Sequence, residues 1–249
     1  MRVWGVLAGV VVAAVTAVAR QAPPLPDPEA FYAAARANIE RAQIEQRDFA
    51  YRERRTELHL NPFGRLGSGG TVVYEYTPLP DGGAERRLVE RDGKPVPGAA
   101  LERRPPRPAR GSRRSAVDDV IGTLQFTIER RTLLEGQPTI AVKFEPKPGA
   151  SAETREANLA RRFAGTILVN EASKEVVRVD AMAIEDLTYG FGMVARLGKG
   201  TSVALTRERV EPNLWLPTSI RFTGSGRALL FRRLAIDQSI EWLNYRRAR

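Results

Sequence analysis

The chain has 249 residues, with 39 Lys and Arg against 29 Asp and Glu, one His and no Cys. Because His59 is the only imidazole and there is no thiol, the composition excludes a disulfide framework, a thiolate nucleophile, a zinc finger and a multi-histidine metal site. The formal net charge of +10 favours anionic partners such as nucleic acid or a membrane surface, and a chain of this length can bury a core of its own.

The first residues have the layout of a secretory signal peptide. Arg2 precedes a mostly apolar run, Val3–Ala19, that ends in small residues. We expect cleavage after Ala19, which makes residues 1–19 the signal peptide and places residues 20–249 in the periplasm. The alternative is an uncleaved inner-membrane anchor, because 17 residues are at the lower limit of what spans a bilayer. Export argues against a nucleic-acid partner, and the missing Cys argues against a lipid anchor at this end.

The segment after a Pro-rich leader predicts an amphipathic helix. Asp27 is a favourable N-cap, and Pro28 occupies the first helical position, where its missing N–H is harmless. Apolar residues then recur at helical spacing, so that one stripe of the helix can pack against the rest of the molecule. The stripe consists of Phe31, Ala35, Ile39 and Ala42.

From Phe49 onward the apolar period changes to two, which indicates strands. The connections between successive strands are too short for repeated βαβ crossovers, which favours an antiparallel meander. Strands are predicted at Phe49–Leu60, Thr71–Thr77, Glu85–Arg91, Leu124–Thr132, Thr139–Pro146, Gly165–Asn170, Glu175–Ile184, Phe191–Leu197, Ser202–Arg209, Leu214–Phe222 and Ala228–Ile236. Two further short helices are predicted at Ser115–Ile121 and Ala152–Arg162.

One face of the predicted sheet is apolar and the other polar. Leu124, Phe126 and Ile128 alternate with polar residues, and so do Ile140, Val142 and Phe144. A large antiparallel sheet with one apolar face must cover it, either by curling into a barrel or by packing helices across it. The N-terminal helix is the best candidate for this cover.

The order of these features resembles that of exported bacterial proteins of the outer-membrane lipoprotein-sorting class, the LolA/LolB/RseB-like superfamily. The segments that carry the resemblance include GTILVNEASKEVVRVDA (Gly165–Ala181) and NLWLPTSIRFTGSGRALLFRRL (Asn213–Leu234). It implies a single α+β domain over residues 20–249. Its core would be an open, strongly curved antiparallel sheet, a half-barrel, with the N-terminal helix and one or two short helices over the concave face, where the carriers hold lipoprotein acyl chains.

A basic segment at 102–114 departs from those carriers. It contains six Arg and three Pro in 13 residues, and the prolines and like charges predict a mobile, extended loop. Such a loop could contact anionic lipid headgroups. The alternative is a solvated insertion without a partner. The candidate membrane contacts are Arg103, Arg104, Arg107, Arg110, Arg113 and Arg114.

Several apolar residues exceed what one core face requires, notably around Met182, where both faces of the predicted strand are apolar. They could line a pocket, for which Met is an adaptable surface, or they could belong to the core. The predicted lining residues are Met182, Ile184, Phe191, Met193, Leu216, Ile220 and Phe222.

Two glycine-rich segments resemble nucleotide motifs but lack the required context. The segment at 190–195 fits G-x-G-x-x-A, yet it is followed by a predicted strand and not by a helix N-terminus. The segment at 198–201 lacks the Ser or Thr after the lysine of a phosphate loop and predicts a turn. No cofactor is expected.

The sequence shows no catalytic constellation. His59 has no G-x-S-x-G partner, and the neighbouring carboxylates Asp118-Asp119 and Glu185-Asp186 diverge on a strand or a helix, which favours solvated surface charge. We therefore expect a non-enzymatic carrier or binder of a hydrophobic or acylated ligand, without a metal. The first alternative is an envelope regulatory or scaffold protein that binds another protein through the same sheet. The second is a hydrolase.

Overall fold

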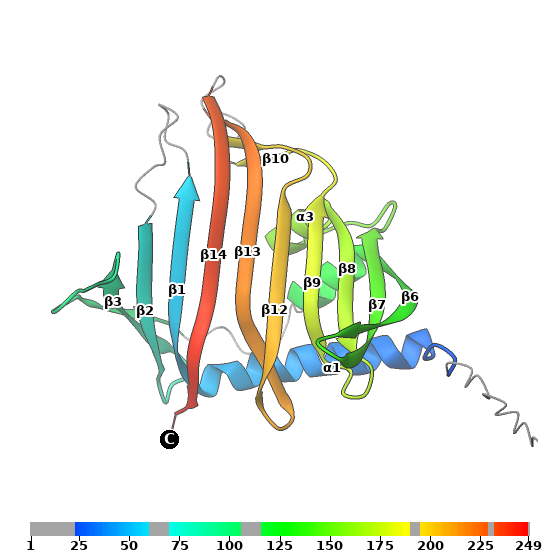
Figure 1. Ribbon diagram of the computed structural model, residues 1–249, viewed down its shortest axis with the longest axis horizontal. Helices are drawn as coiled ribbons and strands as arrows, with labels where there is room; N and C mark the ends of the chain where they lie inside the picture. The colour runs from blue at the N-terminus through cyan, green and yellow to red at the C-terminus, as the bar shows by residue number, and fades with distance from the viewer. Residues whose placement is uncertain (1–22, 60–69, 106–115, 190–194, 229–231, 249) are drawn as a thin grey trace, which may run out of the picture.

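The structure is a computed structural model that describes residues 23–59, 70–105, 116–189, 195–228 and 232–248 (Figure 1). The first helix, α1 (Pro28–Glu45), begins where the sequence predicts: the Asp27 side chain accepts a hydrogen bond of 2.9 Å from the Ala30 N–H. Its stripe packs as expected, with Phe31, Ala35 and Ala42 buried. None of the helices in the described ranges is long and apolar enough to cross a membrane.

Three shorter helical segments follow α1 within the described ranges. A 3₁₀ turn, η1 (Gln46–Asp48), leads from α1 into the first strand. The other two, α2 (Ala116–Gly122) and α3 (Arg155–Ala160), confirm the two short helices predicted from the sequence. Thr154 caps α3, because its hydroxyl oxygen accepts a hydrogen bond of 3.1 Å from the Ala157 N–H.

The described strands form one open antiparallel sheet, which confirms the α+β fold class. Its main path is β4-β3-β2-β1-β14-β13-β12-β9-β8-β7-β6, and within the described residues β4 and β6 are not joined to each other. The bounds are β1 (Phe49–His59), β2 (Gly70–Pro78), β3 (Ala84–Arg91), β4 (Lys94–Pro95), β5 (Leu101–Arg104), β6 (Leu124–Leu134), β7 (Gln137–Pro146), β8 (Phe163–Asn170), β9 (Val176–Ala183), β10 (Leu187–Tyr189), β11 (Ala195–Leu197), β12 (Ser202–Glu211), β13 (Leu214–Ala228) and β14 (Arg232–Arg247).

The end of the chain is the longest strand of the sheet, which the sequence did not predict in full. β14 pairs with β1 from Phe49 opposite Arg247 to His59 opposite Ile236, so the first and last strands lie side by side in the middle of the sheet (Figure 1). The prediction ended at Ile236, because charged residues interrupt the apolar alternation beyond it. Pairing on both sides, with β1 and β13, holds this polar strand in place.

Helix α1 crosses the sheet from the side of β6 to the side of β14 (Figure 1). Near its start, Phe31 and Ala35 pack against Ile140 and Val142 of β7. Near its end, Ala42 packs with Phe49, Leu214 and Leu216 in a separate cluster. The helix is therefore fixed to the sheet at both of its ends.

The beginning of the basic segment is a strand and not a loop, which corrects the expectation for its first residues. β5 pairs with β3, with Arg103 opposite Glu85 and Arg104 opposite Ala84. Arg103 also forms an ion pair of 2.5 Å with Asp81, and the Arg104 guanidinium carbon lies 5.5 Å from the centre of the Tyr76 ring. Backbone pairing to β3 thus outweighs the repulsion between the arginines. The other predicted membrane contacts, Arg107, Arg110, Arg113 and Arg114, lie outside the described residues.

Candidate functional site

The candidate site is built on the face of the sheet that lies toward the helices, which we call the inner face. Alternation along β9 shows how it arises. Val179 and Ala181 point to the inner face, whereas Arg178 and Asp180 point to the outer face and form an ion pair of 2.6 Å there. The sequence pattern of period two therefore separates apolar and charged residues onto opposite faces.

A cavity of about 1130 Å³ lies between the inner face and helices α1, α2 and α3. Every sheet residue that lines it in the described part of the chain is apolar. The bulkiest come from β6, β7, β8 and β13, and the branched aliphatic residues come from β6, β7, β8, β9, β12 and β13. Prominent among them are Phe126, Phe144, Phe163, Ile167, Val203 and Phe222. A space of this size and lining is typical of a site for a large apolar ligand.

Gly165 on β8 lies on the same face as Phe163 and Ile167. A Cβ atom at this position would lie 2.0 Å from the carbonyl oxygen of Asp180 on β9. No other residue fits there without a shift of the backbone of β9, so the glycine is required by the close approach of the two strands.

The helical wall is held together by the two adjacent carboxylates of α2. Asp118 pairs with Arg36, which joins α2 to α1. Asp119 accepts hydrogen bonds of 2.6 Å from both the N–H and the hydroxyl of Thr154, which joins α2 to the start of α3. The sequence predicted solvated charges here. Asp119 is instead only 3% exposed, because it is the acceptor that satisfies the start of α3.

The structure brings together only some of the predicted lining residues. Ile220 and Phe222 line the cavity. Leu216 is fully buried in the cluster with Ala42, away from the cavity lining. Met182 is 56% exposed and Ile184 is 42% exposed, and neither lines the cavity.

The reason for the position of Met182 is the pleat of β9: its neighbour Ala181 points inward, so Met182 points outward. The predicted residues Phe191 and Met193 lie outside the described residues, and so does the side chain of His59. A ligand contact by Phe191 or Met193 stays a prediction.

Sequence reasoning missed most of the cavity lining, although the signal was present. Leu124 and Phe126 alternate with polar residues, as do Val142 and Phe144, and this pattern correctly marked the apolar face. The sequence did not show that the helices leave a space over these residues. That spacing depends on where α2 and α3 are anchored, which is set by Asp119 and other contacts distant in sequence.

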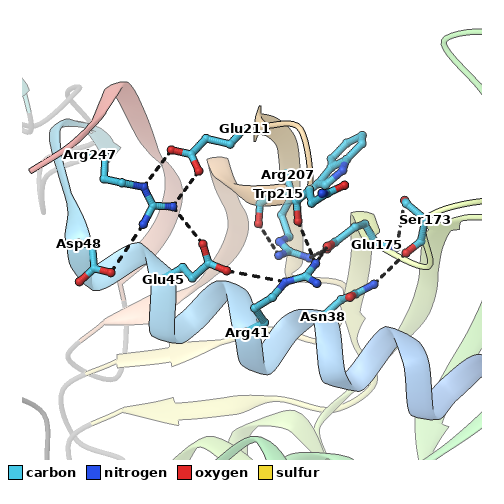
Figure 2. A network of polar contacts seen from close by, with 11 residues as sticks. Asn38, Arg41, Glu45, Asp48, Ser173, Glu175, Arg207, Glu211, Trp215 and Arg247 are labelled. Atoms are coloured by element: carbon cyan, nitrogen blue, oxygen red, sulfur yellow. Dashed lines mark hydrogen bonds and ion pairs between the residues drawn. The ribbon is translucent and has the colours of Figure 1, made fainter.

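A polar network, also missed, fastens the second half of α1 to the sheet (Figure 2). Arg41 on the helix lies 2.8 Å from Glu175, and Arg207 on β12 lies 3.4 Å from the same carboxylate. Arg207 also donates to the carbonyl oxygens of Val176 and Trp215, at 3.0 and 2.6 Å. Burial raises the pKa of Glu175 against the opposing effect of the two arginines, and burial lowers the pKa of Arg207.

Two further contacts extend this network along α1. Asn38 donates a hydrogen bond of 2.8 Å to the carbonyl oxygen of Ser173, and Arg247 at the end of β14 bridges Glu45 and Glu211 at 3.0 and 2.7 Å (Figure 2). Hydrogen bonds to both carboxylates raise the pKa of Arg247. This network leaves α1 firmly placed on one side of the cavity.

No family model and no curated protein matches the sequence. Solved structures that match this chain include a DUF1329 family protein from Desulfovibrio piger, with a TM-score of 0.35 and 16% identity over 89% of this chain and 94% of the other. A LolA superfamily protein from Nitrosomonas europaea has a TM-score of 0.35 and 10% identity over 86% and 93% of the two chains. An outer membrane lipoprotein-sorting protein domain from Vibrio parahaemolyticus has a TM-score of 0.34 and 12% identity over 85% and 92%.

The second and third of these structures carry the class names to which the sequence pattern was likened. Their identities and TM-scores are low, so the function of this chain has to be inferred from its own residues.

Proposed function

We propose that the chain is a non-enzymatic carrier or binder of a hydrophobic or acylated ligand, whose acyl chains lie in the cavity beneath the helices. The observation that supports this proposal is the lining itself: the sheet contributes only apolar side chains to a space of about 1130 Å³. A polar ligand in contact with these walls would lose its hydrogen bonds to water without replacing them.

The driving force would be the burial of apolar surface, which contributes about 0.8 kcal/mol for each buried CH₂ group. Two additional carbons in a saturated chain should therefore tighten binding about tenfold, until the chain fills the cavity. This dependence on chain length distinguishes a carrier from a protein that binds lipid only on its surface.

The first experiment is native mass spectrometry of the protein purified from its own envelope. We expect a mass increment that is lost on extraction with organic solvent and that is identified as a lipid or an acylated molecule. A protein that carries no such ligand, and that also fails to bind fatty acids of any length, would contradict the proposal and favour the envelope-scaffold alternative.

A pair of neighbouring substitutions on β9 tests the location. Ala181→Asp places a carboxylate on the inner face, and Met182→Asp places one on the outer face. Only the first should abolish binding of a fluorescent fatty acid, because an unpaired charge against apolar walls must be hydrated or neutralised. Ala181→Phe serves as a further variant that stays apolar and shortens the preferred chain length. Thermal unfolding of all three variants controls for folding.

The compartment is part of the proposal and rests on the leader alone. If residues 1–19 are removed on export, N-terminal sequencing of the protein from the periplasmic fraction should begin at Arg20. Recovery of the chain with Met1 intact in the membrane fraction would establish the anchored alternative instead.

A further inference from the structure

The chain enters the domain at a fixed point on the side of β6, where α1 begins (Figure 1). The guanidinium of Arg131 on β6 donates hydrogen bonds of 2.7 and 3.1 Å to the carbonyl oxygens of Pro23 and Pro24, the first two described residues. Its Nε also lies 2.6 Å from a carboxylate oxygen of Glu171, so the guanidinium is itself held in place. The sheet therefore sets the position of the chain just before α1.

Two exposed leucines lie next to this point. Leu25 directly follows Pro24 and is 43% exposed. Leu133 lies two residues beyond Arg131 on the same face of β6, shortly before the turn to β7. It is 67% exposed, the highest value among the large apolar side chains of the described ranges. We call the surface formed by Leu25 and Leu133 the entry corner.

The sequence places the apolar leader, Val3–Ala19, a short distance from the entry corner. The leader ends four residues before Pro23, and four residues span at most about 14 Å. While the leader lies in a bilayer, the entry corner is therefore held close to the membrane surface. This tether gives the two leucines a high effective concentration at the lipid, so that even a weak contact becomes populated.

Charge gives the entry corner no preference for anionic lipid. Arg130 pairs with Glu129 at 3.5 Å, and Arg131 pairs with Glu171. Glu135, in the turn between β6 and β7, is an exposed carboxylate. The attraction to a membrane must therefore come from the burial of apolar surface, for which a zwitterionic bilayer is sufficient.

We infer that the entry corner rests on the membrane while the leader is in the bilayer, with Leu25 and Leu133 inserted among the lipids. The inference rests on the leader, which belongs to the proposed function, and adds the side of the domain that faces the lipid. The contact is separate from the one predicted for the basic segment. That segment begins in β5, which pairs with β3, and β3 and β6 lie toward opposite ends of the main path of the sheet.

A single label can report the contact without background, because the chain has no Cys of its own. Leu133→Cys and, as the matched control, Met182→Cys each carry an environment-sensitive dye on the full chain. Met182 is 56% exposed and points to the outer face. The labelled chains are reconstituted with vesicles of pure phosphatidylcholine, and flotation first establishes that the leader attaches them. The dye emission should move to shorter wavelength at position 133 and stay unchanged at position 182.

The outcomes separate the contact from the leader. No emission shift at position 133 in a chain that floats with the vesicles, or an equal shift at both positions, would overturn the inference while the leader's role stands. A chain that does not float would overturn both. The mature chain, residues 20–249, should lose the shift under the same conditions because it has no tether.

A second pair of variants tests the part played by Leu25. In the labelled Leu133→Cys chain, Leu25→Asp should shift the equilibrium between the contacting and the free domain about tenfold toward the free domain, because a carboxylate resists transfer into lipid. Ile44→Asp changes a residue of α1 that is 51% exposed and should leave this equilibrium unchanged. Equal effects of the two substitutions would show that added negative charge alone is responsible and would overturn the assignment to the entry corner.

Discussion

Arg41 Nη2 lies 2.8 Å from Glu175 Oε1, and this contact joins the second half of α1 to the turn that precedes β9. Glu175 is 2% exposed and also faces the guanidinium of Arg207, which is 7% exposed. One carboxylate thus pairs with two arginines between the helix and the sheet, and these pairs fasten α1 to the sheet beside the cavity.

Removing this carboxylate should destabilise the protein strongly. In Glu175→Ala, Arg207 would remain buried without a counter-charge, and breaking a buried pair in this way costs about 3–5 kcal/mol. Urea unfolding would measure the loss. Glu185→Ala breaks the exposed pair with Arg162 and should change the free energy of unfolding by less than about 1 kcal/mol. Equal losses in the free energy of unfolding for the two substitutions would show that the buried network stabilises the fold no more than the exposed pair does.

The anchoring of α3 by Asp119 makes a second prediction. Asp119→Ala removes the acceptor for the Thr154 N–H and hydroxyl and should cost about 1–3 kcal/mol. Hydrogen exchange should show the loss first in α3. Asp118→Ala, at the adjacent half-buried position, should cost less, about 1 kcal/mol, because the partner Arg36 stays exposed to solvent. Unchanged exchange in α3 would contradict the role given to Asp119.

What the sequence predicted well is what depends on local pattern. Asp27 and Pro28 marked the start of α1, and the alternation of Val142 and Phe144 with polar neighbours marked the inner face. These signals are local because capping and pleat involve residues close together in the chain.

What the sequence did not predict depends on distant contacts. Glu175 and Arg207 are 32 residues apart in the sequence. A charged residue is ordinarily expected at the surface, so the sequence did not indicate that either side chain is buried. The same holds for β5, whose arginines gave no sign of pairing with β3. The outward position of Met182 could not be predicted for a different reason: apolar residues occurred on both faces of one strand, and composition cannot choose the face.

Acid should weaken the fold through its exposed ion pairs. Arg131 lowers the pKa of Glu171, Arg221 lowers the pKa of Asp237 and Arg247 lowers the pKa of Glu211. A carboxylate with a lowered pKa in the folded state contributes stability above its unfolded pKa of about 4, and this contribution is lost as the pH falls through the folded value. Glu175, whose pKa is raised, acts in the opposite sense.

We therefore expect the urea concentration at the unfolding midpoint to decrease when the pH is lowered from 5 to 3. Because two of these pairs are exposed and the Arg131–Glu171 pair is partly exposed, added salt should reduce the difference between the urea midpoints at the two pH values. A midpoint that is independent of pH in low salt would show that the exposed pairs do not contribute. The Arg131→Gln variant provides a control in which the contribution of Glu171 is already absent.

The two parts of the basic segment should differ in their accessibility to a protease. Arg103 lies in β5, which pairs with β3, and its side chain forms an ion pair with Asp81. Arg110, Arg113 and Arg114 come after this strand in the sequence, in the part for which the sequence predicts an extended basic loop. Limited trypsin digestion should therefore cleave after the latter three residues before it cleaves after Arg103. Early cleavage after Arg103 would contradict the strand assignment.

The membrane contact predicted for this segment can be tested on the same residues. Replacing Arg110, Arg113 and Arg114 with Gln should weaken binding to vesicles that contain anionic phospholipid, by about 1 kcal/mol for each charge near the surface. Replacing three arginines of the outer sheet face, Arg52, Arg54 and Arg178, keeps the net charge of the two variants equal. If both triple variants lose the same affinity, the attraction comes from the total charge of the protein and the segment is a solvated insertion. A loss confined to the first variant assigns the membrane contact to the basic segment, because only the local arrangement of charge differs between them.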